Sequence, residues 1–262
     1  MVSSSRLLAG QRQTLILERL GEKGMVRTVD LAAEMNVAGM TIRRDLVDLQ
    51  QRGHVVLIHG GAKIPAGSVP PADRRERAAV EVNAKRAIGR SAAELLSSGD
   101  VVYLDSGTTC AATVPYLTGL ENLTVVTNDL TTATDLVAEA PHVRVLMAGG
   151  LVDSQTLSTV GDLFPAVLMN LRFDVALVSA SAWDIDAGAT TGGMEYSAAK
   201  RIVLSHAKRS LLLVDSSKYG ASQAHVIRRL DGFSTVISDS RLGTADQATL
   251  RTAGVHLTLA DY

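Results

Sequence analysis

The chain has 262 residues, of which 46% are hydrophobic and 20% are charged. This composition supplies a packed core and excludes a wholly disordered protein. The single cysteine, Cys110, excludes an intramolecular disulfide framework and a cysteine-based zinc site. No apolar run approaches the roughly 18 residues of a membrane span. We therefore expect a cytoplasmic protein without membrane association, and no motif predicts a metal or a cofactor.

Charge is distributed unevenly along the chain. Residues 1–86 contain 14 Lys and Arg against 9 Asp and Glu, a net charge of +5, and residues 87–262 contain the remaining 12 against 18, a net charge of −6. A basic N-terminal segment indicates contact with a polyanion such as nucleic acid. An uneven but merely solvated surface is the alternative.

The first part of the chain predicts three short helices followed by a β-hairpin. Apolar residues recur at helical spacing in three segments, and two short apolar runs follow on either side of a tight turn at Gly60 and Gly61. This order of elements is that of a winged helix-turn-helix. In chain order the elements are a helix over 9–23, a helix capped by Thr28, a helix over 40–52, a strand over 54–59 and a strand over 62–64.

The third predicted helix carries the residue types of a DNA-recognition helix. Thr41, Arg43 and Arg44 stand near its N-terminus and point away from the apolar stripe of Ile42 and Leu46. A recognition helix presents its N-terminal residues to the major groove, where the arginine fork pairs with guanine edges or with phosphates. The acidic residue after Arg44 is expected to pair with a basic neighbour or to act as a cap. A small helical domain with a charged outer face is the alternative.

The order of these motifs is similar to that of a known family. Thr41-Ile-Arg-Arg-Asp-Leu, followed by a further helical turn, a strand and His59-Gly-Gly-Ala, resembles the DNA-binding head of the DeoR family of bacterial transcriptional regulators. The chain departs from that family at Ala38-Gly39, where a serine cap is usual, so that either the helix start frays or Gly39 takes over the cap. The residues that we predict to contact operator DNA are Thr28, Met40, Thr41, Arg43, Arg44, His59, Gly60 and Lys63.

The composition changes after the predicted hairpin. Residues 65–71 read Pro-Ala-Gly-Ser-Val-Pro-Pro, which favours a linker over a helix. We therefore place a winged helix-turn-helix domain at 9–64, a linker at 65–72 and an α/β domain at 73–262. A helix over 73–97 is predicted to open the α/β domain.

Seven short apolar runs follow, most of them separated by segments of helical length. Near-continuous apolar strands that alternate with helices are typical of a parallel sheet covered on both faces. The predicted fold class is therefore an N-terminal winged helix-turn-helix followed by a larger, mainly parallel α/β sensor domain. Ligands of such sheets bind at the carboxyl ends of the strands. The predicted strands are 101–104, 123–126, 143–147, 175–178, 211–214, 236–237 and 255–259.

Several of these strands run directly into polar turns. Asp105-Ser106-Gly107-Thr108-Thr109 follows the first strand, Thr127-Asn128-Asp129 ends the second, and Asp215-Ser-Ser-Lys218 follows the fifth. Hydroxyls, backbone N–H groups and a helix start favour an anion at such a turn, although the Gly-Lys-Ser/Thr ending of a Walker sequence is absent. An ordinary loop is the alternative for any one of them. Several polar strand ends at one edge of one sheet favour a binding site.

The second segment also resembles the DeoR family, in its effector-sensing domain, which is similar to ribose-5-phosphate isomerase and binds phosphorylated sugars or related metabolites. The resemblance implies a phosphate cradle, a set of residues that border the sugar, a neutralising lysine, and an acidic and then a basic residue before the penultimate strand. In that order these are Ser106, Gly107, Thr108 and Thr109; Asp105, Thr127, Asn128 and Asp129; Lys218; and Glu195 and Lys200.

The leading hypothesis is therefore a transcriptional repressor of a carbohydrate-metabolism operon that responds to a phosphorylated sugar and is not an enzyme. Because one DNA-binding head offers few contacts, we expect a homodimer or homotetramer on repeated half-sites. Four basic residues near the linker, Lys63, Arg74, Arg75 and Arg77, are expected to add contacts to DNA phosphates. The linker and the helix after it are the parts able to transmit the effector's preference.

Two other functions stay open. A sugar-phosphate isomerase with an appended DNA-binding head could use Asp184 or Asp186 as the base and Lys218 as the cation. The isomerases carry a denser acidic loop than the Trp183-Asp-Ile-Asp of this chain, which favours binding without turnover. Trp183 itself either covers the sugar or packs in the core. A nucleoid or RNA-binding module that ignores small molecules is the third hypothesis.

Overall fold

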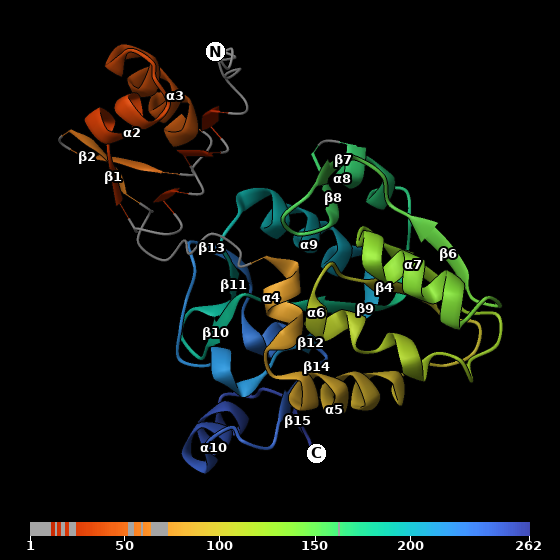
Figure 1. The fold of residues 1–262 in the computed structure, drawn as a ribbon. Helices are drawn as coiled ribbons and strands as arrows, with labels where there is room; N and C mark the ends of the chain where they lie inside the picture. The colour runs from red at the N-terminus through yellow and green to blue at the C-terminus, as the bar shows by residue number, and fades with distance from the viewer. Residues whose placement is uncertain are drawn as a thin grey trace. The chain divides into compact units, whose positions relative to one another are not determined.

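The structure is a computed structural model, and it describes residues 12–13, 15–16, 19–20, 25–51, 55–58, 60–63, 73–161 and 163–262. The chain divides into two compact units, Met1–Pro70 and Pro71–Tyr262 (Figure 1). We call the first the DNA-binding unit and the second the sensor unit, after the functions that their sequences predict.

The DNA-binding unit is a small antiparallel sheet packed against helices. The strand order is β1-β3-β2, and the helical residues among 12–20 pack with two further helices on one core. This arrangement confirms the winged helix-turn-helix. The elements are β1 (Met25–Arg27), α2 (Thr28–Glu34), α3 (Gly39–Gln51), β2 (Val56–Ile58) and β3 (Gly61–Lys63). The largest buried side chains are those of Ile16, Leu20, Leu31, Ile42, Leu46 and Leu49.

Two local predictions in this unit need correction. Thr28 is not the cap of α2, because Arg27 occupies the N-cap position and Thr28 is the first helical residue. The backbone N–H of Thr28 donates to the Gly60 carbonyl at 2.9 Å, which ties the wing to α2. Gly60 alone has the left-handed φ of 81° that the tight turn requires, whereas Gly61 belongs to β3, where a Cβ would lie 1.9 Å from the Val26 carbonyl oxygen.

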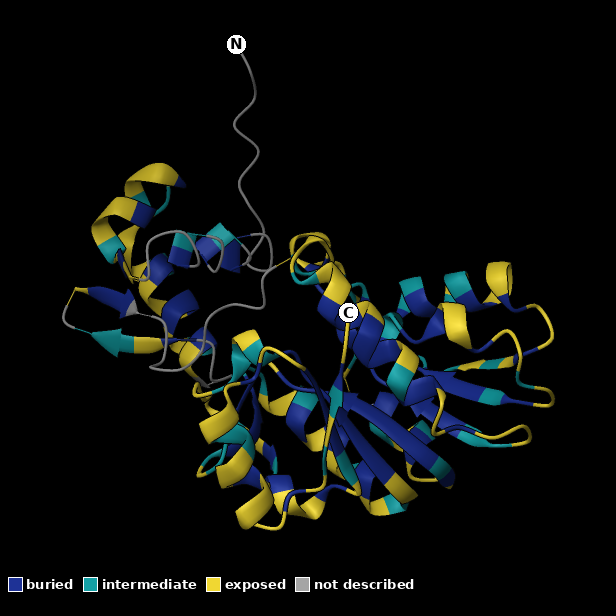
Figure 2. Cartoon of the chain, turned by 90° about the horizontal axis from the view of Figure 1, so that it is seen from below, coloured by how far each residue is buried: buried dark blue, intermediate teal, exposed yellow. Residues whose placement is uncertain are grey.

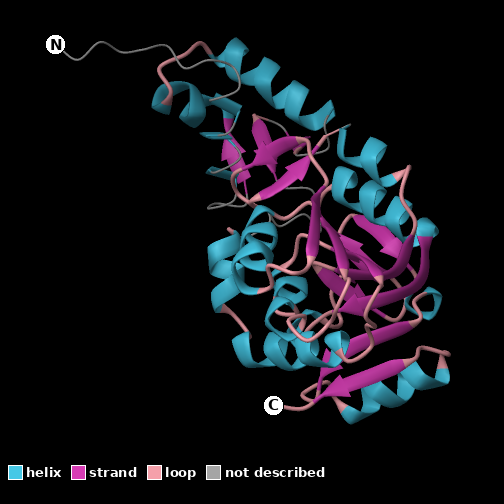
Figure 3. Cartoon of the chain, turned by 90° about the vertical axis from the view of Figure 1, so that its right-hand side faces the viewer, coloured by secondary structure: helices cyan, strands magenta, loops and turns pink. Residues whose placement is uncertain are grey.

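The sensor unit is built on a seven-stranded parallel sheet in the order β15-β14-β12-β9-β4-β5-β6. Each strand coincides with one of the seven predicted apolar runs. Figure 3 shows the sheet between two layers of helices. The strands are β4 (Val101–Leu104), β5 (Thr124–Thr127), β6 (Arg144–Met147), β9 (Phe173–Ser179), β12 (Ala207–Leu213), β14 (Thr235–Asp239) and β15 (Leu257–Ala260).

The two faces of the sheet bury two separate cores. In β4, Val102 and Leu104 pack into the core under α5, α6 and α7, whereas Tyr103 points into the core under α8, α9 and α10. Strands buried on both faces explain the near-continuous apolar runs of the sequence (Figure 2). The helices are α5 (Val82–Ala93), α6 (Thr108–Ala111), α7 (Leu130–Glu139), α8 (Leu163–Leu168), α9 (Met194–His206) and α10 (Thr244–Thr252).

The predicted helix over 73–97 is wrong, because the segment forms two helices. α4 (Arg74–Ala79) ends at Val80, Glu81 takes a left-handed φ of 55°, and α5 starts at Val82. The side chain of Lys85 bends back to donate to the carbonyls of Arg77 and Val80, so the end of α4 is held by α5. This contact stabilises a break that periodicity alone does not indicate.

Further short strands lie beside the main sheet. One pair forms an antiparallel hairpin, and three others form a second small sheet in the order β10-β11-β13. Three short 3-10 turns complete the unit. In the described part of the chain no helix is both long enough and apolar enough to cross a membrane. The remaining elements are β7 (Leu151–Asp153), β8 (Ser158–Val160), β10 (Ala182–Asp184), β11 (Gly188–Thr191), β13 (His225–Arg228), η1 (Val114–Tyr116), η2 (Ser216–Lys218) and η3 (Leu230–Gly232).

Candidate functional site: a DNA-recognition helix and a polar crevice in the sensor sheet

The recognition helix α3 presents an exposed face of basic and apolar residues. Arg43 and Arg44 are exposed, Met40 is 72% exposed and Val47 is 36% exposed. Positions i, i+3, i+4 and i+7 share one face of a helix, so these four side chains form one stripe opposite the buried one. Thr41 is half-buried at the edge of this stripe. The face can enter a major groove with two arginines at its centre.

The acidic residue of the motif points inward. Asp45 is buried and accepts hydrogen bonds from Arg12 Nε at 2.5 Å and Arg12 Nη2 at 3.0 Å, which holds the first helix against α3 and removes the carboxylate from the DNA-facing side. Gly60 is exposed in the wing turn. Lys63 ends β3, but its side chain lies outside the described structure, and His59 lies outside the described residues.

The sensor sheet changes direction between β4 and β9. From β4 the chain proceeds through β5 to β6 on one side, and from β9 it proceeds through β12 and β14 to β15 on the other. Ligands of such sheets bind where the carboxyl ends of these two strands meet. The loop after β4 approaches the end of β9 so closely that a Cβ on Gly107 would lie 2.2 Å from Ser179 Oγ. Gly107 is therefore required by this close approach.

We call this meeting point of the carboxyl ends of β4 and β9 the crevice, and a buried ion pair closes its centre. Asp105 Oδ2 accepts from the backbone N–H of Ser179 at 2.9 Å, from Ser179 Oγ at 2.8 Å and from Lys200 Nζ. Lys200 Nζ also donates to the Ser179 carbonyl at 2.9 Å. The side chains of Lys200 and Asp105 are 9% and 2% exposed. These two predicted effector residues therefore satisfy each other and join β4, β9 and α9.

Asn128 connects three loops at the next strand end. It is buried, its Oδ1 accepts from the Tyr103 hydroxyl at 3.0 Å, and its Nδ2 donates to Ser106 Oγ at 3.3 Å and to the Thr159 carbonyl at 3.0 Å. Thr127 is fully buried, and its hydroxyl accepts from the backbone N–H two residues later. Asn128 thus fixes the loop after β4 to the loop after β5.

Asp129 caps α7 and holds α4. Its Oδ1 accepts from the Thr132 N–H at 2.8 Å, and its Oδ2 lies 2.8 Å from Arg74 Nη1, an ion pair without the alignment of a hydrogen bond. Burial raises the pKa of Asp129, and the charge of Arg74 opposes this shift. Arg74 also donates through Nε to Thr131 Oγ1 at 3.1 Å and through its backbone N–H to the Gln155 carbonyl at 3.1 Å. Arg74 is 5% exposed and is held by the sensor unit. The expectation from the sequence that it contacts DNA phosphates is therefore wrong.

The other predicted effector residues differ in exposure. Lys218 is half-buried, and its Nζ lies 3.3 Å from Asp215 Oδ2 and 3.5 Å from the Ala180 carbonyl. Glu195 is exposed in the first turn of α9, whereas Lys200, five residues later, is buried. The structure therefore does not bring these two residues together on one face.

The predicted phosphate loop leads into a very short helix. Thr108 is half-buried and begins α6, Thr109 is buried, and α6 has four residues. One helical turn contributes a small dipole, so the hydroxyls of Ser106 and Thr108 and nearby cations must carry the attraction for an anion.

Sequence reasoning missed Ser179 and Lys85. Ser179 ends β9, so the rule that strand ends line the site could have identified it. Lys85 is buried, and burial, with a further contribution from the positive charge of Lys218, lowers its pKa to about 8. A lysine in a helical pattern gives no signal of this environment, because it depends on the break between α4 and α5.

Asp184, one of the two bases considered for isomerase chemistry, and Trp183 beside it have structural roles. Asp184 Oδ1 accepts from the backbone N–H of Asp186 at 2.9 Å and of Ala187 at 3.3 Å, so it closes the turn between β10 and β11. Trp183 is fully buried, donates from Nε1 to the Asp215 carbonyl at 3.1 Å and stacks edge-on with Tyr219. Trp183 therefore packs in the core and does not cover a ligand.

A groove of about 670 Å³ lies beside the crevice, on the sheet face covered by α5, α6 and α7. It shares Thr108 with the predicted phosphate loop, and it is lined by residues of α4, α5, α6, η1 and α7 and by Leu157. The volume suits a small metabolite.

Comparisons with known proteins agree with both units. Residues 12–67 match the model of the DeoR-like helix-turn-helix domain, and residues 80–240 match that of the DeoR C terminal sensor domain. The chain is 36% identical over 232 residues to the uncharacterized HTH-type transcriptional regulator YgbI of Escherichia coli (strain K12), an alignment that covers 88% of this chain and 90% of the relative.

Two further relatives are named as repressors. Identity is 31% over 227 residues to the lactose phosphotransferase system repressor of Staphylococcus epidermidis (strain ATCC 35984), covering 86% of this chain and 90% of the relative. Identity is 31% over 212 residues to the glycerol-3-phosphate regulon repressor of Escherichia coli (strain K12), covering 80% and 82%. The chain therefore belongs to the DeoR family and is a transcriptional regulator with an N-terminal helix-turn-helix and a C-terminal sensor domain.

Proposed function

We propose that this regulator represses a carbohydrate-metabolism operon and that a phosphorylated sugar bound by the sensor unit changes its affinity for operator DNA. The observation that carries the proposal is the combination in one chain of an arginine-bearing recognition helix with polar strand ends at the direction change of a parallel sheet and a groove beside them at Thr108. The names of two relatives, repressors of a glycerol-3-phosphate regulon and of a lactose phosphotransferase system, support the carbohydrate assignment.

In this proposal the DNA-binding residues divide into two groups. Arg43 and Arg44 contact guanine edges or phosphates, with Met40 and Thr41 beside them on the same helix. The second group contacts DNA from the wing and consists of Thr28, His59, Gly60 and Lys63. The backbone hydrogen bond between Thr28 and Gly60 holds the wing against α2. We expect a homodimer or homotetramer, because two heads on repeated half-sites add the contacts that one head lacks. The protein acts in the cytoplasm, where operator DNA lies.

The sensor residues also divide by role. Ser106, Gly107, Thr108 and Thr109 form the phosphate loop, and Lys218 neutralises charge at its side. Asp105, Lys200, Thr127, Asn128 and Asp129 hold this loop and its neighbours in position, because each is bonded to groups on neighbouring strands, loops or helices. Glu195, exposed at the start of α9, contributes at the rim.

We infer that the sensor unit binds its effector without converting it. Isomerisation needs a carboxylate base held against the substrate. Asp184 is engaged in the turn between β10 and β11, and Asp186 is exposed in the same turn. An assay with ribose 5-phosphate tests this inference. Turnover that is lost in Asp184→Asn or Asp186→Asn would contradict it and favour the isomerase.

The experiment that tests the proposed function is a thermal-shift screen of the full chain against triose, pentose and hexose monophosphates. A ligand that binds only the folded protein raises its melting temperature. Any ligand found is then titrated into wild type and Thr108→Val while DNA affinity is measured by fluorescence anisotropy. We expect Thr108→Val to bind DNA like wild type and to lose the response to the sugar phosphate. A response at wild-type concentrations would place the phosphate elsewhere.

A further inference from the structure

The crevice and the groove differ in what they offer a ligand. At the crevice, the Asp105–Lys200 pair and the Asn128 amide are buried and bonded to other protein groups. The groove is open, and apolar side chains of α5 and η1 alternate there with charged ones. The groove therefore has room for a metabolite, whereas the polar groups of the crevice are already bonded to one another. Thr108 belongs to both.

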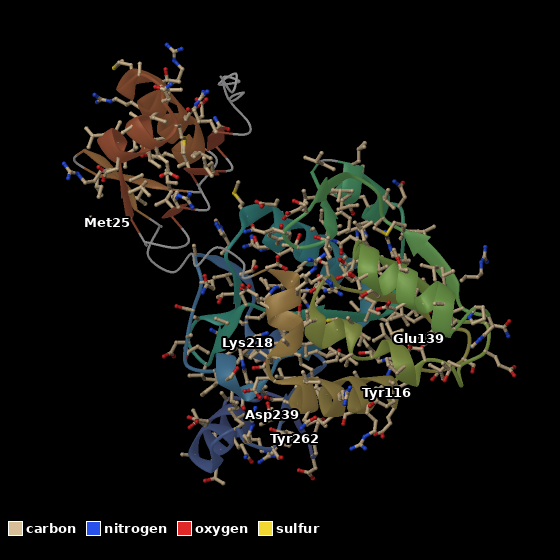
Figure 4. All side chains as sticks on the ribbon, viewed as in Figure 1. Met25, Tyr116, Glu139, Lys218, Asp239 and Tyr262 are labelled. Carbon is tan, nitrogen blue, oxygen red and sulfur yellow. The ribbon has the colours of Figure 1, made fainter. Side chains whose placement is uncertain are left out.

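The groove is lined by more positive than negative charge. Four cations, Arg74, Arg75, Lys85 and Arg86, line it on α4 and α5, against two carboxylates, Asp135 and Glu139 on α7, an excess of two positive charges. Figure 4 labels Glu139 and Tyr116, two of the residues that line it. Because cations and carboxylates stand on different walls, an anion on the α4–α5 side avoids the carboxylates of α7.

Two of these cations are held in place by the protein. Arg74 is anchored by Asp129 and Thr131, and Lys85 by the carbonyls of Arg77 and Val80. Both side chains belong to residues that are 5% exposed. Ordering long side chains before binding reduces the entropy lost on binding. Arg75 and Arg86 are exposed at the mouth of the groove and remain accessible to a ligand.

We propose that the groove is the anion-binding part of the effector site, in which the cations of α4 and α5 face Thr108 across a bound phosphoryl group. This inference rests on the proposed function for the identity of the effector, a sugar monophosphate, and goes beyond it by assigning Arg75, Lys85 and Arg86 to its recognition. The apolar wall of Val82, Val114, Pro115 and Leu157 contacts the carbon skeleton.

The groove lies against the first helix of the sensor unit. α4 is the first helix of the sensor unit, and its N-terminal residue Arg74 is joined to Asp129. A phosphoryl group in the groove competes with the Asp129 carboxylate for the same guanidinium. Occupancy therefore changes what holds α4, the element that follows the predicted linker, and this differential contact is what a population shift requires.

Matched arginine variants on α5 and α4 test the proposal in the full chain. Arg75→Gln/Arg86→Gln removes two groove cations, and Arg90→Gln removes an exposed arginine one turn further along α5 that lies outside the groove and donates to the Asp261 carbonyl. Glycerol 3-phosphate, ribose 5-phosphate and glucose 6-phosphate are titrated by calorimetry. For each that binds wild type, we expect the double variant to bind at least about tenfold more weakly and Arg90→Gln to match wild type. Equal affinity in all three proteins overturns the proposal.

Tungstate, an anomalously scattering analogue of phosphate, locates the site independently of the effector. We expect a tungsten peak in crystals of the full chain between Thr108 and the α4–α5 cations. A sensor-unit peak only beside Lys200 and Lys218, or none, overturns the groove assignment. If no sugar monophosphate binds wild type but tungstate occupies the groove, the proposed effector class is wrong and the anion site stands. The two inferences therefore fail in distinguishable ways.

Discussion

Replacing Lys200 by methionine removes the positive partner of a buried ion pair at the centre of the sensor sheet. The Lys200 and Asp105 side chains are 9% and 2% exposed, and Lys200 also donates to the Ser179 carbonyl. Breaking a buried pair by removing one partner costs about 3–5 kcal/mol, because the other charge stays buried without compensation. We expect Lys200→Met to lower the free energy of unfolding of the sensor unit by this amount.

Urea unfolding followed by tryptophan fluorescence measures this loss. Trp183 is the single tryptophan and is fully buried in the sensor unit, so its signal reports that unit alone. Lys208→Met is the matched control, because it breaks a surface Lys–Asp pair whose lysine is 79% exposed, and its midpoint should match wild type. In Lys200→Met/Asp105→Asn both charges are gone, and the loss should be smaller than the sum of the single losses by at least about 1 kcal/mol. Equal effects of Lys200→Met and Lys208→Met would refute the reasoning.

Three further predictions concern DNA, backbone packing and protonation. Arg43→Ala and Arg44→Ala should each weaken operator binding, measured by fluorescence anisotropy, by about 1–3 kcal/mol if the side chain is bidentate to a base. Unchanged affinity in both variants would exclude α3 from the DNA interface. Gly107→Ala should lower the free energy of unfolding of the sensor unit in urea by about 1–3 kcal/mol, because the added Cβ would lie 2.2 Å from a side-chain oxygen. Gly119→Ala, with open space around it, is the control and should unfold like wild type. Equal midpoints of the two variants would contradict the close approach. Burial and a neighbouring lysine lower the pKa of Lys85 to about 8, so an anion in the groove should raise it again and draw in about half a proton at pH 8. Calorimetry of the sugar phosphate in two buffers of different ionisation enthalpy measures this uptake, and identical heats would exclude it.

The sheet was predictable because local pattern and tertiary environment agree there. β4 is buried on both faces, with Val102 and Leu104 in one core and Tyr103 in the other, so it reads as an unbroken apolar run. The same holds for β5, β9, β14 and the C-terminal half of β12, whereas the edge strands β6 and β15 are partly exposed. The recognition helix was predictable for a related reason, since its stripe of Ile42 and Leu46 is buried and its arginines are exposed.

Elements that depend on particular side-chain contacts, or that are very short, were not predictable. Periodicity favours one helix over 73–97, but the hydrogen bonds of Lys85 to two carbonyls of α4 and the left-handed Glu81 divide it. The strands of the β7–β8 hairpin and of the β10-β11-β13 sheet are three or four residues long and contain polar residues. Segments this short give no usable period in the sequence.

The candidate site was predictable at the level of strand ends and not at the level of partners. The polar turns after β4 and β5 meet through Asn128 and Ser106, as the parallel topology requires. The sequence gives no indication that Lys200 pairs with Asp105 or that Arg74 turns inward to Asp129. Both contacts are made between residues more than fifty positions apart, and only the folded sheet brings them together.

The proposed regulation depends on one coupling, between a phosphorylated sugar in the sensor unit and DNA at the recognition helix. The most direct measurement is the operator affinity of the full chain by fluorescence anisotropy, with and without a saturating sugar monophosphate from the thermal-shift screen. We expect the affinity to change by at least about fivefold, the lower range of allosteric coupling. An unchanged affinity, with binding of the same sugar phosphate confirmed by calorimetry, would contradict the account.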